Sequence, residues 1–420
     1  MKWICSQIGA REHYSVPRVL HRSGKLEYFY TDLWAGGTMW QAIGSLLGRP
    51  MLQNRYHEDL FDARVESFDI TTSVDSVFGG NLKKNPYEWF LYVGSDFGRS
   101  VEESLSRKKG LNWKETIFFG YDTGFLEPAQ FVKSRGGKAI VCQMDPSRFE
   151  VDLVKEEEKI WPGWAKRLLE VPESYFKRRE EEWKVADLVM VNSEWSRQAL
   201  IGQGVNVGKI IVVPLAYDPN VKSRRYGEKA MSQPTKTSLQ DSWSSVSSPN
   251  PNLRVLFLGQ VILRKGIQYL IEAAKILCGE AVQFDVVGPI GISEEAIKSA
   301  PDNMIFCGPI SRKRAPEFFA KADLFVLPTL SDGFALTQIE AMAYGLPVIT
   351  TQNCGDVVSD GVDGMIVRAR DGVALAEAIY SLIQDSDKLK HMKQATLAKV
   401  RQFTLPVLSD NLNFLELLIK

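Results

Sequence analysis

The stretch FVLPTLSDGFALTQIEAMAYGLPVIT, residues 325–350, has the pattern of a buried strand, a loop containing Gly333, a helix and a second strand. The helix is predicted to begin near Leu336. The first backbone N–H groups of a helix lack partners within the helix and carry a partial positive charge. We therefore expect the amides of Ala335, Leu336 and Thr337 to form a seat for a phosphate group.

Two acidic residues accompany this phosphate seat, Asp332 in the loop and Glu340 one turn into the helix. A carboxylate can accept hydrogen bonds from two neighbouring hydroxyls, so Glu340 suits a ribose and Asp332 suits a sugar. Taken alone, the same two residues are explained equally well by a turn-shaping Asp and a Glu that favours the helix N-terminus.

A second strand, loop and helix, VLFLGQVILRKGIQYLIEAAKIL at residues 255–277, brings Arg264 and Lys265 to the start of a helix. Fixed cations can stabilise a departing diphosphate without a metal ion. Losing one such contact typically costs about 10²–10³ in rate. An isolated Arg-Lys pair is more often a solvated pair of charges. The pair therefore indicates a phosphate-binding site only in combination with residues 325–350.

Together these segments resemble the group 1 (family 4) retaining glycosyltransferases of the GT-B fold, whose pattern runs close to EGFGLPLLEAMACGTPVI. The resemblance implies that Lys265, Arg264 and Asp332 are catalytic, with the two cations on the donor diphosphate and Asp332 on the donor sugar. It implies that Glu340 holds the ribose. It also implies a donor site that includes Gly259, Gln260, Ile310, Gly333, Phe334, Ala335, Leu336 and Thr337.

This sequence departs from the family pattern at three places. Asp332 replaces a Glu, which shortens the reach by one methylene, and Gln260 follows Gly259 where the family often has Arg. Near the end of a later strand in the N-terminal half, where the family commonly carries a His, Asp145 stands instead. A structural turn before Pro146 explains Asp145 nearly as well.

The loop after the first strand, IGAREHYSVP at residues 8–17, supplies Glu12, His13 and Tyr14. With Asp145 they are the predicted acceptor-side residues, and the alternative is a polar loop that caps the following helix. A charged run, KRREEEWK at residues 177–184, is predicted to be a solvated helix face.

Short apolar runs alternate with helical patterns in both halves of the chain, which predicts an α/β protein with two Rossmann-like, doubly wound parallel-sheet domains facing across a cleft. We expect an N-terminal acceptor-side domain over residues 1–220 and a nucleotide-sugar donor domain over residues 252–404. A mobile linker or loop rich in Ser and Pro is expected over residues 221–251. Residues 405–420 are expected to form a helical tail that can return to the first domain.

The charges balance at 51 Lys plus Arg and 51 Asp plus Glu, so no global field favours nucleic acid as a partner. Five scattered cysteines without a CxxC pair and four histidines without ligand spacing predict no metal site, no cofactor and a reducing, cytoplasmic location. No run of about 18 apolar residues is present. Peripheral membrane contact through a surface helix stays open.

The sequence therefore predicts a retaining, metal-independent glycosyltransferase of glycan or glycoconjugate biosynthesis. It would move a sugar from a nucleotide-sugar donor, with UDP-linked donors preferred, to a saccharide, lipid-carrier or small-molecule acceptor. The alternatives are a non-catalytic nucleotide-sugar-binding module and another enzyme on a similar scaffold, such as an epimerase or phosphorylase. A dinucleotide-dependent oxidoreductase is disfavoured because no GxGxxG follows a predicted strand.

Overall fold

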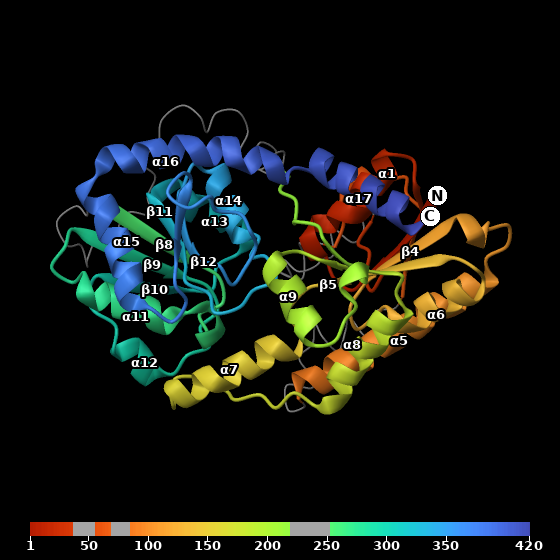
Figure 1. Ribbon diagram of the computed structural model, residues 1–420, viewed down its shortest axis with the longest axis horizontal. Coiled ribbons are helices and arrows are strands. Elements are labelled where there is room, and N and C mark those ends of the chain that lie inside the picture. The colour runs from red at the N-terminus through yellow and green to blue at the C-terminus, as the bar shows by residue number, and fades with distance from the viewer. Residues whose placement is uncertain (37–54, 69–84, 219–252) are drawn as a thin grey trace. The chain divides into compact units, whose positions relative to one another are not determined.

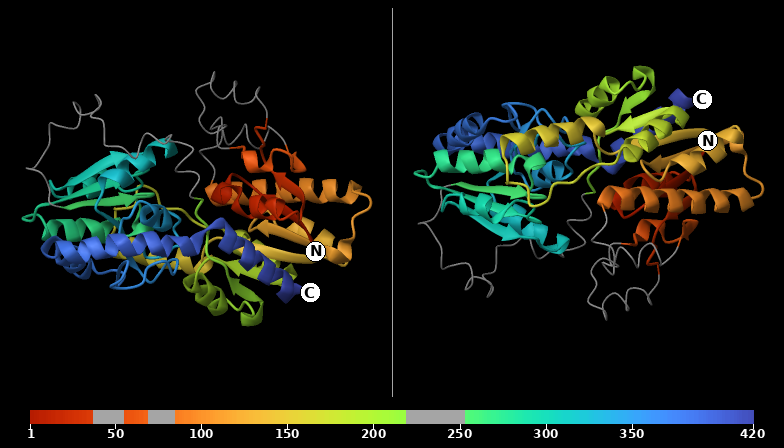
Figure 2. Two further views of the ribbon diagram at one scale, coloured as in Figure 1. Left: turned by 90° about the horizontal axis from the view of Figure 1, so that it is seen from above. Right: turned by 90° about the horizontal axis from the view of Figure 1, so that it is seen from below.

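The computed structural model describes residues 1–36, 55–68, 85–218 and 253–420, and it divides into two compact units (Figures 1 and 2). The first unit comprises Met1–Phe149, Leu169–Ala216 and Leu405–Lys420, and the second comprises Glu150–Leu168 and Tyr217–Thr404. The predicted linker 221–251 lies outside the described residues. Both units are built on parallel sheets, as the alternating pattern predicted.

A parallel sheet with the strand order β3-β2-β1-β4-β5-β6-β7 forms the centre of the first unit. The order reverses between β1 and β4, and open α/β sheets bind ligands at such a switch point, beyond the carboxyl ends of the strands. The strands are β1 (Lys2–Gln7), β2 (Leu26–Thr31), β3 (Val65–Ser67), β4 (Thr116–Tyr121), β5 (Lys138–Gln143), β6 (Leu188–Val191) and β7 (Ile210–Val212).

Helices cover both faces of this sheet because successive strand residues point to opposite sides. Cys5 and Phe119 belong to one apolar cluster, and their neighbours Ile4 and Phe118 belong to the other. Helices α1 and α17 supply side chains to the first cluster, and α5, α6 and α8 supply the second. The helices of this unit are α1 (Ser15–Arg22), α5 (Pro86–Arg107), α6 (Leu126–Ser134), α8 (Glu173–Val185), α9 (Glu194–Gly202) and α17 (Leu405–Ile419).

Helix α17 is the predicted helical tail, and it packs beside α1 in the first unit (Figures 1 and 2). Leu408, Leu412, Leu415 and Ile419 are buried at the spacing of one helix face. Their burial in the same cluster as α1 explains why the chain end belongs with the chain start.

Residues 150–168 belong to the second unit, whereas the predicted domain 1–220 included them in the first. Helix α7 (Arg148–Ile160) is tied to the second unit by Glu157, whose side chain is fully buried. The Glu157 carboxylate accepts hydrogen bonds from Gln268 Nε2 at 2.9 Å, from the Tyr269 hydroxyl and from Arg370 Nε at 2.8 Å. These contacts span more than 110 positions in the chain, so no local pattern could reveal them.

The second unit has a parallel sheet with the order β10-β9-β8-β11-β12-β13, which reverses between β8 and β11. Both of these strands are largely buried, as expected for strands covered on two faces. The strands are β8 (Leu253–Leu258), β9 (Val282–Val287), β10 (Met304–Gly308), β11 (Leu324–Leu327), β12 (Val348–Thr351) and β13 (Gly364–Val367). The helices are α11 (Ile267–Ile276), α12 (Glu294–Lys298), α13 (Ala315–Lys321), α14 (Thr337–Ala343), α15 (Gly372–Gln384) and α16 (Ser386–Lys399).

Across the described parts of the chain, we find no helix with both the length and the apolar character needed to cross a membrane.

Candidate functional site

The predicted donor residues lie where β8 and β11 end, at the switch point of the second sheet. Gly259 and Gln260 follow β8 directly, and Gln260 is exposed. Arg264 and Lys265 then lie in a short 3-10 helix before α11. Asp332 lies in the loop that follows β11.

A glycine lets the two halves of this site approach each other. Gly266 has a φ of 74°, and a Cβ at this position would lie 1.8 Å from the carbonyl oxygen of Pro328. Only a residue without a side chain fits, so the start of α11 can pack directly on the loop after β11. A backbone hydrogen bond also joins that loop to the segment that carries the two cations, since the Leu330 amide donates to the Arg264 carbonyl at 2.8 Å.

The structure brings Arg264, Lys265 and Asp332 together, as the sequence predicted, and adds Glu150 from helix α7. Lys265 Nζ forms an ion pair with Asp332 Oδ2. Arg264 Nη1 lies 3.8 Å from the same oxygen, 3.3 Å from Glu150 Oε2 and 2.9 Å from the Ser331 carbonyl oxygen, to which it donates. The Ser331 hydroxyl donates to Glu150 Oε2 at 2.9 Å. Two cations and two carboxylates thus form one cluster.

Burial makes Lys265 easy to deprotonate. Removal of its ammonium from water and the nearby Arg264 guanidinium lower the pKa of Lys265 to about 7, although Glu150 and Cys354 act in the opposite direction. A lysine whose pKa lies near neutrality is partly a neutral amine, and that amine takes up a proton when a further anion arrives. The cluster is therefore suited to receive a phosphate group.

The loop between Asp332 and α14 is shaped by Asp332 itself. Its Oδ1 accepts the backbone N–H groups of Phe334 at 3.2 Å and Ala335 at 3.0 Å. The Ala335 amide, predicted to be part of the phosphate seat, is thus used inside the loop, where Ala335 adopts a φ of 60°. Leu336 and Thr337 lie at the start of α14, within one residue of the predicted helix start.

The remaining predicted donor residues are arranged around this loop. Gly333 is buried, and the Phe334 ring is buried 5.9 Å from the Phe403 ring, so Phe334 can offer only backbone groups to a ligand. Glu340 lies on α14 with its Oε1 3.6 Å from Arg312 Nη2. Ile310 follows β10 and is half-buried.

The predicted acceptor-side residues of the first unit differ in accessibility. Glu12, His13 and Tyr14 follow β1 with φ values of 49°, 54° and 61°, a left-handed run that is costly for residues with side chains. The Glu12 carboxyl is buried, which raises its pKa, and it accepts a hydrogen bond from Ser15 Oγ at 3.0 Å. The Tyr14 ring packs on Phe29 and lies within the core, so its side chain does not face outward. His13 is partly exposed.

Asp145 is partly exposed and belongs to an ion-pair network beyond the ends of β4 and β5, whose other members, Arg179 and Asp122, are buried. Arg179 Nη1 and Nη2 donate to its two carboxylate oxygens at 2.7 and 2.9 Å. The same guanidinium pairs with Asp122 Oδ2 at 2.5 Å. The sequence analysis missed Arg179 and Asp122. The run at residues 177–184 was predicted to be solvated, but Arg179, Glu182 and Trp183 are buried, because α8 packs its charged residues over the polar strand ends.

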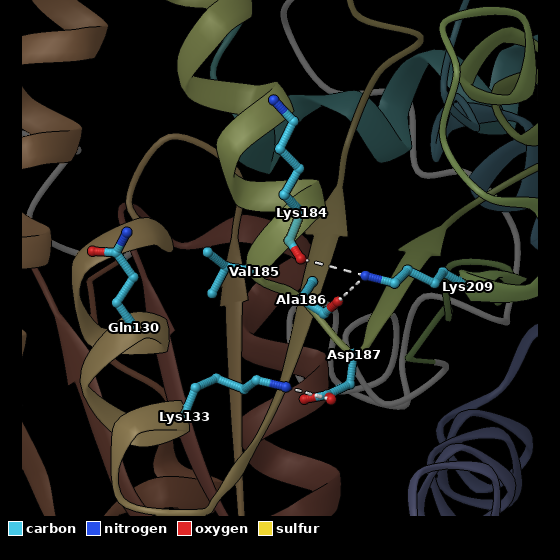
Figure 3. Close-up of a pocket in the computed structure, with 7 residues that line it drawn as sticks. All are labelled: Gln130, Lys133, Lys184, Val185, Ala186, Asp187 and Lys209. Atoms are coloured by element: carbon cyan, nitrogen blue, oxygen red, sulfur yellow. Dashed lines mark hydrogen bonds and ion pairs between the residues drawn. The ribbon is translucent and has the colours of Figure 1, made fainter.

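A surface depression of about 430 Å³ lies elsewhere in the first unit, near the amino end of β6 (Figure 3). Lys209 Nζ donates there to the carbonyl oxygens of Lys184 at 3.3 Å and Ala186 at 2.9 Å, and Lys133 Nζ pairs with Asp187 at 2.5 Å. The lysines thus cap the end of α8 and hold β6, which is a structural role.

Residues 252–385 match the family model described as "Glycosyl transferases group 1". This part of the chain is therefore similar to group 1 glycosyltransferase domains. The D-inositol 3-phosphate glycosyltransferase of Xylanimonas cellulosilytica is 28% identical over 249 residues, which cover 56% of this chain and 58% of that protein. The capsular polysaccharide biosynthesis glycosyltransferase CapM of Staphylococcus aureus is 34% identical over 146 residues, 32% of this chain and 38% of that protein.

The chain thus spans about half the length, or less, of these curated relatives. The similarity in fold to solved structures covers nearly the whole chain. The solved structure of Anabaena Alr3699/HepE in complex with UDP superposes with a TM-score of 0.64 at 16% identity, covering 99% of each chain. The predicted GT-B fold is confirmed by this likeness and by the two Rossmann-like sheets.

Proposed function

We propose that the protein is a retaining, metal-independent glycosyltransferase that transfers a sugar from a nucleotide-sugar donor to an acceptor hydroxyl. The observation that carries the proposal is the cluster of Arg264, Lys265, Asp332 and Glu150 at the switch point of the second sheet. Three of these residues lie within the segment that matches the group 1 family.

In this proposal the donor diphosphate replaces a carboxylate as the partner of the cations. Lys265 leaves Asp332 and contacts a phosphate oxygen, and Arg264 contacts a second one while Glu150 and the Ser331 carbonyl hold its guanidinium. Asp332 then meets hydroxyls of the sugar. Glu340, which the family resemblance assigns to the ribose, lies on the helix that starts beside this loop.

The transfer itself needs one bond made and one bond broken. The acceptor oxygen attacks the anomeric carbon, the bond from that carbon to the diphosphate oxygen breaks, and the acceptor proton passes to the departing diphosphate. Attack on the face from which the diphosphate leaves retains the configuration. Arg264 and Lys265 stabilise the developing negative charge, so no metal ion and no cofactor is required in this scheme.

UDP-sugars are the proposed donors. The likeness of fold to Alr3699/HepE, which was solved with UDP, supports this choice. The proposed acceptor is a saccharide, because the similar Staphylococcus aureus protein is named for capsular polysaccharide biosynthesis. A lipid-linked or small-molecule acceptor would react in the same way, through a hydroxyl group. The acceptor residues in this proposal are His13 and the Asp145 carboxylate, with Arg179 fixing the orientation of Asp145.

Thermal unfolding in the presence of UDP, GDP, ADP and their sugars, with and without EDTA, tests the donor assignment, because a selective ligand stabilises the folded state. We expect UDP compounds to raise Tm, EDTA to leave the shift unchanged and Glu340→Ala to abolish it. Glu317→Ala, an exposed residue of α13, is the matched control. No shift with any nucleotide would contradict the proposal.

Product analysis by proton NMR tests the transfer step. An α-linked product from an α-linked donor is expected, and a β-linked product would exclude retention. A chain that binds UDP but yields no glycoside with any saccharide or lipid-linked acceptor would be a nucleotide-sugar-binding module instead.

A further inference from the structure

A small cavity lies at the switch point of the first sheet, where β1 and β4 end side by side. The two strands pair with Ser6 opposite Gly120, and each strand ends one residue later, at Gln7 and Tyr121. The cavity has a volume of about 10 Å³, which is room for one group of the size of a water molecule. Its place in the sheet is the one at which open α/β folds bind their ligands.

Four polar atoms of side chains that line this cavity have no hydrogen-bond partner among the residues that the structure describes. They are Ser6 Oγ, Gln7 Oε1, Arg11 Nε and the Tyr121 hydroxyl oxygen. Ser6, Gln7 and Tyr121 are only 2%, 2% and 4% exposed, so bulk water reaches them little. Buried polar atoms are nearly always paired, because an unpaired one lowers stability. Four around one space point to a polar group that enters it.

The surrounding chain fixes the chemical character of these atoms. Gln7 Nε2 donates to the Gly9 carbonyl oxygen at 2.8 Å, which leaves Oε1 as an acceptor. Burial and the neighbouring Glu12 carboxyl raise the pKa of Tyr121 well above its usual value, so its hydroxyl keeps its proton and can donate. The Arg11 guanidinium lies over the Tyr121 ring, 5.5 Å from its centre.

The backbone next to the cavity is strained. The three residues that follow Arg11 have φ values of 49°, 54° and 61°. Strain of this kind persists only where the surrounding structure holds it, and it gathers at binding sites. The loop after β1 is therefore held in one conformation beside the unpaired polar atoms.

This mixture of donors and acceptors suits a hydroxyl group. Gln7 Oε1 only accepts and Arg11 Nε only donates, whereas the hydroxyls of Ser6 and Tyr121 do both. A ligand hydroxyl also does both. A phosphate or carboxylate group accepts alone, so it would meet Gln7 Oε1 and the Asp122 carboxylate, which also lines the cavity, without a bond. A phosphate group is also larger than the single water molecule for which the cavity has room.

We propose that this cavity binds the hydroxymethyl group of an uncharged saccharide and thereby anchors the acceptor. The hydroxyl bonds to Ser6, Gln7 and Tyr121. Ile8 and Phe97 also line the cavity, and their apolar side chains suit the adjoining methylene carbon. The inference rests on the proposed function, because it takes the bound saccharide to be the acceptor, and it adds that the anchoring group carries no phosphate.

Saturation-transfer NMR on the full 420-residue chain measures saccharide binding without a donor. The probes are the methyl glycosides of glucose, galactose and mannose, each compared with its 6-deoxy and 6-phosphate derivatives. We expect at least one methyl glycoside to bind. Its two derivatives should bind about 3–10-fold more weakly, the usual loss for one hydrogen bond. Absence of binding by all three glycosides, equal binding of the 6-deoxy derivative or tighter binding of the 6-phosphate would each overturn the proposal.

Variants of the cavity separate a ligand site from a site for a structural water molecule only. Tyr121→Phe should weaken glycoside binding about 3–10-fold and leave Tm unchanged or higher, because a buried hydroxyl without a partner is removed. Ser6→Ala should repeat the loss of binding. A lower Tm with unchanged glycoside binding in both variants would show a structural water and overturn the proposal. Tyr380→Phe, on the exposed face of α15, is the matched control and should alter neither quantity.

UDP binding distinguishes this inference from the proposed function. The donor cluster belongs to the second unit, so Tyr121→Phe should keep the full Tm shift with UDP. A normal UDP shift without glycoside binding would overturn the inference alone. Glycoside binding without any nucleotide shift would instead contradict the donor assignment and leave the saccharide site in place.

Discussion

UDP binding should take up a proton at Lys265. In the free protein burial and Arg264 lower the pKa of Lys265 to about 7, and a diphosphate beside the amine favours its charged form and raises that pKa. Below pH 7 the amine is already protonated, so affinity is independent of this group. Above pH 7 each bound UDP must bring in a proton, and affinity should fall about tenfold per pH unit.

Isothermal titration calorimetry between pH 7 and 8.5 measures both quantities. With a pKa of about 7, most of the Lys265 amines are neutral at pH 8 before binding, so buffers of different ionisation heat should report a clear proton uptake that grows between pH 7 and 8.5. The Cys354 thiol, with a pKa raised to about 11, stays protonated in this range, and the phosphate of UDP, with a pKa of about 6, stays ionised.

Two variants identify the titrating group. Lys265→Met should weaken UDP binding about 10–100-fold at pH 7, the usual loss for one charge-assisted hydrogen bond, and should abolish proton uptake. Glu150→Gln keeps an acceptor for the Ser331 hydroxyl but removes a charge that raises the pKa of Lys265. In this variant the fall in affinity should begin below pH 7, whereas Glu156→Gln, an exposed neighbour on α7, should leave the profile unchanged. A flat profile between pH 7 and 8.5, or proton uptake that persists in Lys265→Met, would refute the reasoning.

Two stability predictions follow from the packing of the second unit, each measured by urea unfolding. Gly266→Ala should lower the free energy of unfolding by more than about 2 kcal/mol, because its Cβ would meet the Pro328 carbonyl oxygen in a left-handed conformation. Gly259→Ala is the control, because its Cβ would meet nothing within 4 Å, and it should change the free energy of unfolding little. Equal effects of the two substitutions would show that this steric clash does not determine stability. Glu157→Gln should cost about 1–3 kcal/mol because it weakens three hydrogen bonds to a buried carboxylate, while Glu156→Gln, which is mostly exposed, should stay within about 0.5 kcal/mol.

Local sequence predicted the strands, the helices and the donor loops well. A strand buried on both faces is a short apolar run, and the strands predicted within residues 255–277 and 325–350 are β8, β11 and β12 of the second sheet. Asp332, Arg264 and Lys265 were also predictable as a group, because the strands that precede them are neighbours at a switch point and direct their loops to one place.

Contacts between distant segments were beyond the reach of local patterns. Glu150 reaches Ser331 across 181 positions, and nothing in the sequence around it distinguishes it from the other acids of α7. Arg179 lies in a run that has the composition of a solvated helix face, yet its partner Asp122 is 57 positions away and buried. Charged residues of this kind become interpretable only when their partners are known, because burial is tolerated where charges are paired.

Pairing also decides what the donor site can recognise. Arg264 and Lys265 already contact Asp332 and Glu150, so a ligand gains from these cations only if it brings negative charge to exchange for a carboxylate. A free sugar or a nucleoside leaves the ion pairs intact and should bind far more weakly than UDP. UMP has one phosphate fewer to offer, so it should fall between uridine and UDP in affinity and take up less than the proton that UDP takes up at pH 8. If uridine bound as tightly as UDP, the base and ribose contacts would carry recognition, and the cluster around Lys265 would have no part in donor binding.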